Sequence, residues 1–247
     1  MTQEIVLYDI PSKGPCTSWS GNALKTRIAL NYKKIPYRTE WVPYIRLQQT
    51  LKDTGVKPNP EPNWSDYSVP TVRFPDGRVI MDSAKIAPEL EKIQPNPPLH
   101  LDLKFHEKVG EAAGAMLHPL VAYFMSRVER DVIVEEDIEW YKADRTARLG
   151  KPLTELEKEK GTGSTPWDEA KPGFEIVEKL LHDHKKDEGP FILGSEPTYG
   201  DIVLIAWTRM FKVVGDLARD DTYDKFVNGA KGLRELYEAG EKWCESI

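Results

Sequence analysis

The sequence predicts a small α/β domain followed by an all-helical domain, and three observations support this division. Thirteen of the 19 prolines lie in residues 1–98. The net charge changes at the same place, from +3 over residues 1–98 to −9 over residues 99–247, which together give the −6 of the 247-residue chain. Strand-like segments are confined to the first part, and long helical segments fill the second. We therefore expect two domains, at residues 1–94 and 99–247, joined by a linker at 95–98.

The first domain is predicted to have the element order βαβαββα. Strands are predicted, from β-branched and aromatic content or from alternation, at residues 4–10, 37–42, 68–74 and 78–81. Helices are predicted at residues 20–34, 46–53 and 83–93. Asp76-Gly77 is a typical hairpin turn and joins the last two strands. We expect the strands to form one sheet that the helices cover.

The second domain is predicted to consist of long helices. Their expected positions are residues 101–131, 136–148, 168–187, 200–217 and 222–243. Residues 150–166 are rich in Lys, Glu and Gly and have few apolar side chains, so we interpret them as a solvated loop. Thr198 and Asp201 have the spacing of a capping box, in which each residue bonds the backbone of the other at a helix start.

Composition argues against several classes of protein. No apolar run approaches the ~18 residues of a membrane span, and the N-terminus does not have the pattern of a secretory signal. Cys16 and Cys244 lie near opposite ends of the chain and form no metal-binding spacing, so we expect a cytoplasmic protein without a metal. The acidic net charge disfavours nucleic acid as a partner.

The element order, together with four short segments, resembles the glutathione transferases. The segments are residues 20–30, Val69-Pro70 before the third strand, Asp82-Ser83 at the start of the third helix, and the cap at 198–201. Within that superfamily, residues 8–12 and the pattern Trp19-Ser20-x-Asn22-x-x-Lys25-Thr26-Arg27 are most similar to fungal serine-type enzymes, which are related to bacterial β-etherases. The resemblance implies a thioredoxin-like first domain, glutathione as co-substrate, a homodimer, and a role in detoxification or secondary metabolism.

Ser20 stands where a loop enters the first helix, and the resemblance implies that it contacts the glutathione thiol. A free thiol has a pKa of about 8.5, so a transferase must stabilise the thiolate. A helix N-terminus and a hydroxyl both supply hydrogen-bond donors for this purpose. Asn22, in the first turn, is a second candidate donor. Gly21 replaces the proline of many relatives, and Ser18 and Cys16 remain alternative contacts to the thiol.

The rest of glutathione is expected to meet three further segments. The resemblance implies a cis peptide bond at Val69-Pro70, which would let the Val69 backbone pair with the cysteinyl main chain. The Ser83 hydroxyl and its neighbouring N–H groups are expected to hold the γ-glutamyl carboxylate, and Asp82 to face its ammonium group. A simple N-cap role for Ser83 is compatible with this. Candidate donors to the glycine carboxylate are Arg46, Gln48, Gln49 and Lys52.

The second substrate, a hydrophobic electrophile, is expected between the domains, over the first long helix of the second domain. Its candidate contacts are Met116, Tyr123, Phe124 and Arg127. The expected reaction is attack of the thiolate on an electrophilic carbon, with conjugation or ether cleavage as the result. Two alternatives stay open: glutathione-dependent cis–trans isomerisation, and a glutathione- or ligand-binding module with little turnover.

Overall fold

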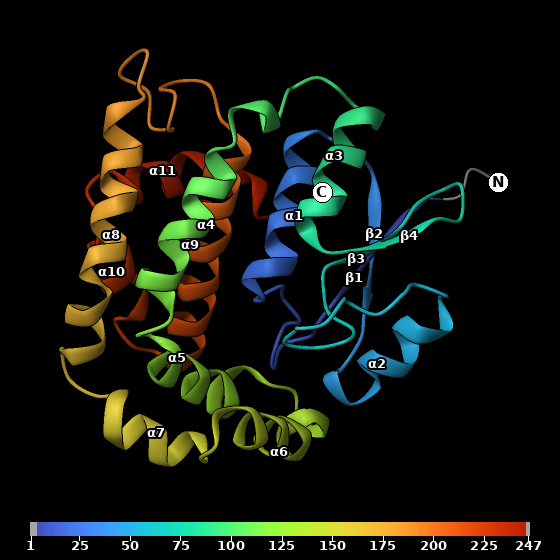
Figure 1. Ribbon diagram of the computed structural model, residues 1–247, viewed down its shortest axis with the longest axis vertical. Coiled ribbons are helices and arrows are strands. Elements are labelled where there is room, and N and C mark those ends of the chain that lie inside the picture. The colour runs from blue at the N-terminus through green and yellow to red at the C-terminus, as the bar shows by residue number, and fades with distance from the viewer. Residues whose placement is uncertain (1–3, 246–247) are drawn as a thin grey trace.

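The computed structural model describes residues 4–245 and has an α/β part followed by a helical part, as the sequence predicts (Figure 1). The predicted order βαβαββα is confirmed. Its elements are β1 (Ile5–Asp9), α1 (Gly21–Tyr32), β2 (Tyr37–Trp41), α2 (Tyr44–Asp53), β3 (Thr71–Arg73), β4 (Val79–Met81) and α3 (Ser83–Ile93).

The four strands form one mixed sheet in the order β2-β1-β3-β4. β1 runs parallel to β2 and antiparallel to β3, with Tyr8 opposite Thr71. β3 and β4 form the predicted hairpin, with Thr71 opposite Met81. This register brings the end of β1, the start of β3 and the end of β4 to one edge of the sheet. There the Asp82 N–H donates a hydrogen bond of 3.1 Å to the Pro70 carbonyl.

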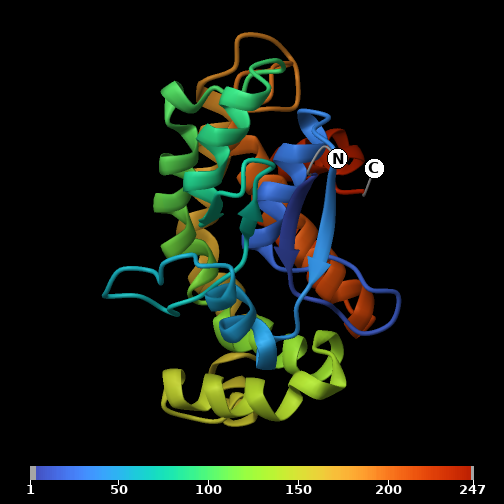
Figure 2. The ribbon, with the colours of Figure 1, turned by 90° about the vertical axis from the view of Figure 1, so that its right-hand side faces the viewer.

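The helical part is built around α9, which contacts α1 on one side and α4, α10 and α11 on others. Its elements are η1 (Leu101–Leu103), α4 (Phe105–Leu117), α5 (Val121–Arg127), η2 (Val128–Val132), η3 (Glu135–Asp137), α6 (Ile138–Leu149), α7 (Leu153–Lys160), α8 (Thr165–Asp183), α9 (Tyr199–Ala218), α10 (Thr222–Val227), α11 (Leu233–Gly240) and η4 (Glu241–Trp243). In both ribbon views α6 and α7 lie together at one end of the molecule (Figures 1 and 2). None of the helices within residues 4–245 has the length and apolar character of a membrane span.

Three sequence predictions about the helical part are wrong in detail. The single helix expected over 101–131 is divided, because Pro119 has no N–H to donate to the helical hydrogen-bond pattern; α4 ends at Leu117 and α5 begins at Val121. The expected solvated loop at 150–166 contains α7, which buries Leu153. The helix expected over 222–243 is interrupted before α11 by Gly232, whose φ is 87°.

The segment that follows α3 and the C-terminal segment at η4 are both fixed to the end of α1. Lys33 is almost fully buried, and its ammonium donates to the carbonyls of Gln94 (2.7 Å) and Pro97 (2.8 Å) and lies 2.6 Å from the Glu91 carboxylate. Two residues earlier, the Asn31 amide donates to the Trp243 carbonyl at 2.8 Å. A buried ammonium needs such partners because desolvation of an unpaired charge is costly. α1 is therefore held firmly between the sheet and the helical part.

Candidate active site

Three of the segments singled out in the sequence meet at one edge of the sheet. The loop that leads to Ser20 leaves β1 beside Pro70, because Tyr8 and Thr71 are paired. The hydrogen bond from Asp82 to the Pro70 carbonyl joins the second segment to the third. The N-termini of α1 and α3 therefore open toward the same region (Figure 1).

Ser20 is the N-cap of α1, with extended backbone (φ −71°, ψ 116°) and a half-buried side chain. Its carbonyl accepts the first helical hydrogen bond, from the Leu24 N–H at 2.9 Å. Its hydroxyl, however, accepts no capping hydrogen bond from the described residues of the helix. The N–H groups of the first turn have no carbonyl partners within a helix. The start of α1 therefore combines a free hydroxyl with free N–H groups, an arrangement suited to an anion.

Gly21 lies where α9 packs on the first turn of α1. A Cβ atom at this position would lie 2.9 Å from the Met210 sulfur and 3.1 Å from Cδ1 of Trp207. A larger side chain there would require the side chains of Met210 and Trp207 to move. Trp207 and Met210 were not among the residues that the sequence suggested, because nothing local to α9 indicates that it faces Ser20.

Ser18 is committed to a buried ion-pair network behind the loop. Its hydroxyl donates to the Asp9 carboxylate at 2.6 Å, and the Arg27 guanidinium donates to the same carboxylate at 2.9 Å. Arg27 continues to Thr39 of β2 at 3.0 Å. Burial raises the pKa of Asp9, and the Arg27 charge and the Ser18 hydrogen bond oppose that shift. Ser18 therefore ties the loop to β1 and α1 instead of facing a ligand.

Cys16, the other alternative contact to the thiol, is exposed and free. Partial desolvation raises the pKa of its thiol. A thiol that forms mixed disulfides readily has the opposite property, a lowered pKa. Among the three candidates, the structure therefore favours Ser20.

The peptide bond between Val69 and Pro70 is cis, as the resemblance implies. The Val69 side chain is buried in an apolar cluster that also contains Tyr8 and Trp19. Within residues 4–245, its N–H and C=O form no hydrogen bond. Both backbone groups are therefore available to an added peptide strand.

Asp82, and not Ser83, is the N-cap of α3. Its carboxylate accepts a hydrogen bond of 3.0 Å from the Ala84 N–H, and its φ of 89° is unusual for a residue other than glycine. The alternative in which Ser83 serves as a simple cap does not hold. The Ser83 carbonyl accepts a hydrogen bond from the Tyr199 hydroxyl at 3.2 Å, which fixes the start of α3 to α9.

The expected donors to the glycine carboxylate differ in their availability. Arg46 is paired with Glu136 at 3.1 Å, and Gln49 donates to Asp53 at 2.6 Å. At the start of α2, the Asp137 carboxylate accepts hydrogen bonds from the N–H groups of Tyr44 and Ile45, at 2.8 and 2.9 Å. These two N–H groups are therefore already bonded. The remaining candidates on α2 are the exposed side chains Gln48 and Lys52.

The candidate contacts to the electrophile are separated in the structure. Met116 has no exposed surface and packs against Gly173 of α8, so it belongs to the helical core and the expectation for it is wrong. Phe124 packs at a tilted angle against Phe211 of α9, and it also contacts the apolar cluster that includes Trp19. Phe124 is therefore the electrophile candidate that shares an apolar cluster with the segment before Ser20.

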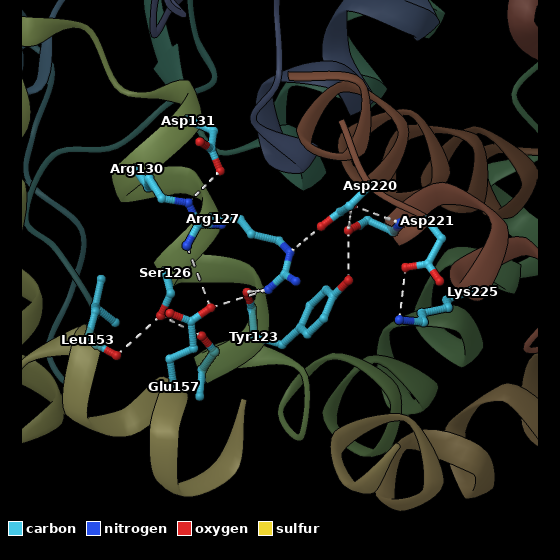
Figure 3. Close-up of polar contacts among 12 residues, drawn as sticks. Tyr123, Ser126, Arg127, Arg130, Asp131, Leu153, Glu157, Asp220, Asp221 and Lys225 are labelled. Carbon is cyan, nitrogen blue, oxygen red and sulfur yellow. Dashed lines mark hydrogen bonds and ion pairs between the residues drawn. The ribbon is translucent and has the colours of Figure 1, made fainter. Parts of the chain in front are cut away.

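Tyr123 and Arg127 belong to a polar network between α5, α7 and α10 (Figure 3). The Tyr123 hydroxyl lies 2.8 Å from that of Thr222, and Arg127 donates to Asp220 at 2.7 Å. Both residues line a cavity of about 470 Å³ whose walls also include Trp167 and Lys225. The residues at the sheet edge do not line this cavity, so the structure does not bring Tyr123 and Arg127 to Ser20.

The comparisons with known proteins agree with this architecture. Residues 19–93 match the family model for the glutathione S-transferase N-terminal domain, and residues 105–232 match the model for the C-terminal domain. The chain belongs to the glutathione S-transferase family, with a thioredoxin-like N-terminal part and a helical C-terminal part.

Three of the similar proteins come from fungi. A curated glutathione S-transferase-like protein, ustS of Aspergillus flavus, is 28% identical over 96% of this chain and 90% of its own length. The crystal structure of glutathione transferase GSTFuA2 from Phanerochaete chrysosporium has a TM-score of 0.85 at 25% identity, covering 99% of this chain and 100% of that one. A Ceriporiopsis subvermispora glutathione S-transferase in complex with glutathione has a TM-score of 0.83 at 26% identity, covering 99% of each chain.

Proposed function

We propose that this protein is a serine-type glutathione transferase in which Ser20 stabilises the glutathione thiolate for attack on an electrophilic small molecule. The observation that carries the proposal is the start of α1, where the Ser20 hydroxyl is not used as a cap. The glutathione-bound relative of the same family supports glutathione as the co-substrate.

In this proposal residues 1–94 bind glutathione, residues 99–247 contribute to the electrophile pocket, and residues 95–98 link them. The Val69 backbone pairs with the cysteinyl main chain, and Asp82 and Ser83 bind the γ-glutamyl group at the start of α3. Of the α2 candidates for the glycine carboxylate, Gln48 is preferred to Arg46, because the latter is paired with Glu136.

The Ser20 hydroxyl donates a hydrogen bond to the thiolate and forms no covalent bond itself. The side-chain oxygen of Asn22 accepts from Lys25 at 3.0 Å, which leaves the Asn22 amide N–H groups available as further donors. A reduction of the thiol pKa by ~2 units requires about 2.7 kcal/mol of preference for the anion. The thiolate then forms the S–C bond, and the leaving group departs with the electron pair of the bond that breaks. For the electrophile, Met210 supplies apolar surface next to Gly21, and Phe124 contacts the apolar cluster that includes Trp19.

The decisive experiment replaces the hydroxyl. Ser20→Ala is expected to raise the pKa of bound glutathione and to lower kcat/KM by about 100-fold, the effect of one hydrogen bond to a charged group. The thiolate absorbance of the glutathione complex is measured against pH, together with turnover of halogenated arenes, isothiocyanates and aryl ethers. Ser164→Ala is the matched control, because Ser164 is also an N-cap whose side chain makes no capping bond, at the start of α8. An unchanged thiol pKa in Ser20→Ala contradicts the assignment.

The same assay separates the alternatives. Binding of glutathione without turnover of any electrophile would favour the binding module. Isomerisation of a cis–trans substrate without consumption of glutathione would favour the isomerase. We also propose a cytoplasmic homodimer, on the basis of the family; light scattering of the purified protein tests the dimer.

A further inference from the structure

Strand β2 lies at one edge of the sheet, and its outer side faces away from the other strands (Figure 2). The Val42 N–H, just after β2, donates to the Asp9 carbonyl of β1 at 2.8 Å. Because backbone groups alternate in direction along a strand, the N–H and C=O groups of Tyr37, Thr39 and Trp41 point away from β1. In the part of the chain that the structure describes, no segment outside the sheet bonds to these groups. The outer side of β2 therefore offers free donors and acceptors to a further strand.

One buried side chain fixes the conformation of this strand. Arg27 of α1, which is 2% exposed, donates to the hydroxyls of Tyr37 at 3.2 Å and Thr39 at 3.0 Å. Its guanidinium also lies 5.2 Å from the centroid of the Trp41 ring. All residues of β2 pair with β1 in a continuous register, without a bulge. The edge therefore needs no rearrangement before it accepts another strand.

The charges of β2 do not protect it against pairing in the way that most edge strands are protected. Natural edges commonly carry proline, a bulge or charges that repel a second copy, or they are very short. The other edge strand, β4, has three residues, whereas β2 has five. The two charged residues of β2, Arg38 and Glu40, have opposite signs, lie 2.7 Å apart and are each 46% exposed. They are therefore available to complement a strand of the same sequence.

The sequence of β2, Tyr-Arg-Thr-Glu-Trp, complements itself when it is reversed. If two copies pair antiparallel about a two-fold axis at Thr39, Arg38 of each copy lies opposite Glu40 of the other, and Tyr37 lies opposite Trp41. Thr39 then pairs with itself. The outward backbone groups form the hydrogen-bonded pairs, and the charged residues occupy the non-hydrogen-bonded pairs, where side chains approach more closely. Opposite charges and aromatic pairs across strands are both stabilising.

The same charges specify the register of the pairing. A shift to the next register that keeps the hydrogen-bond pattern moves the two-fold axis to Arg38 or to Glu40. Arg38 would then lie opposite Arg38, or Glu40 opposite Glu40, and like charges directly opposite each other are destabilising. The axis at Thr39 is therefore the register that the charges favour.

We propose that the outer edge of β2 binds a second copy of this chain, so that the two four-stranded sheets join through antiparallel β2 strands. This inference rests on the homodimer proposed above and assigns its interface. The interface adjoins the proposed active site through one network, because Arg27, which is bonded to Thr39, also holds Asp9 behind the loop that leads to Ser20.

The test uses two charge reversals and their mixture. Arg38→Glu makes both charges of β2 negative, and Glu40→Arg makes both positive, so each variant alone places like charges opposite one another. Each is expected to weaken dimerisation by about 10- to 100-fold. In an equimolar mixture, every negative strand can pair with a positive one, and a heterodimer should form with nearly the affinity of the wild type. Sedimentation velocity measures the dissociation constants, and native mass spectrometry identifies the heterodimer.

Glu155→Arg is the matched control, because it makes the same change in net charge at an exposed ion pair on α7, where Glu155 lies 3.6 Å from Lys151. It should leave the dimer unchanged. An equal loss in this control would show a general effect of charge and overturn the inference. Circular dichroism and thermal unfolding show whether each variant is folded.

The remaining outcomes separate the interface from the dimer itself. If Arg38→Glu and Glu40→Arg both dimerise like the wild type, the homodimer uses another surface and the inference is overturned while the homodimer stands. The inference is also overturned if both variants are monomeric and their mixture contains no heterodimer. If the wild type is monomeric, the proposed homodimer fails and the inference fails with it.

Discussion

Helices α1 and α9 both have a hydroxyl residue at the N-cap, Ser20 and Thr198, but the hydrogen bonds at the two helix starts differ. At α9, the Thr198 hydroxyl accepts from the Asp201 N–H, and the Asp201 carboxylate in return accepts from the Thr198 N–H at 2.7 Å, so the predicted capping box is present. The same carboxylate accepts from the Ile192 N–H at 2.7 Å. At α1, the Ser20 side chain makes no such bond with the described helix. The first N–H groups of α9 are thus bonded by side chains of its own capping box, whereas at α1 the N-cap side chain makes no such bond.

This difference separates stability from function. Asp201 is fully buried, so its hydrogen bonds hold together the loop before α9 and the helix itself. Ser20 is half-buried and its hydroxyl contributes little that the fold requires. A helix start whose N–H donors have no partners contributes less to stability. The same free donors can bind an anionic ligand.

The largest effect is expected for Asp201→Ala. This change leaves the Ile192 and Thr198 N–H groups buried without acceptors, and we expect it to lower the free energy of unfolding by about 4 kcal/mol. Urea denaturation measures the change. Asp201→Asn, which keeps one acceptor oxygen, should lose less. A loss below about 1 kcal/mol for Asp201→Ala would contradict the view of this cap as a closed folding element.

A smaller effect is expected for Thr198→Ala, which removes one half of the capping box and leaves Asp201 in place. Loss of an N-cap side chain costs about 1 kcal/mol in unfolding free energy. Glutathione binding by the folded variant should not change, because the contact between α9 and the start of α3 is made by Tyr199 and not by Thr198. A weakened affinity for glutathione at this variant would show that the two helix starts are coupled.

The smallest change in stability is expected for Ser20→Ala, in contrast to its large effect on the thiol. Since no capping bond is lost, the free energy of unfolding should change by less than about 0.5 kcal/mol. Parallel urea titrations of Ser20→Ala and Thr198→Ala make this comparison directly. A loss as large as that of Thr198→Ala would mean that Ser20 caps α1 after all.

Much of the fold could be predicted from the chain because its signals are local. The hairpin turn Asp76-Gly77 and the capping box at Thr198 and Asp201 depend on residues within a few positions of one another, and both are present. The helix break at Pro119 was available from the same kind of signal, although a single helix was expected there. Helix α7 was missed because its few apolar residues, such as Leu153, give only a weak pattern.

The candidate site was predictable only in part. Ser20, Val69 and Asp82 were found because the short segments that contain them resemble segments of glutathione transferases. Tyr123 and Arg127 were assigned to the wrong surroundings because helical periodicity shows which residues share a face and not which element that face meets. The side chains packed around the site, Lys25 and Met210 among them, come from two helices far apart in the chain.

By itself, the sequence determined the order of the elements in the α/β part, the hairpin turn at Asp76-Gly77 and the capping box of α9. These features follow from the backbone preferences and short-range hydrogen bonds of neighbouring residues, whereas the three segments of the proposed glutathione site were suggested by the family resemblance. Only the tertiary structure decided that α9 packs on Gly21 and that Asp9, paired with Arg27, accepts a hydrogen bond from the Ser18 hydroxyl. These arrangements depend on contacts between distant segments, where burial and charge are set by the packing of whole helices and the sheet.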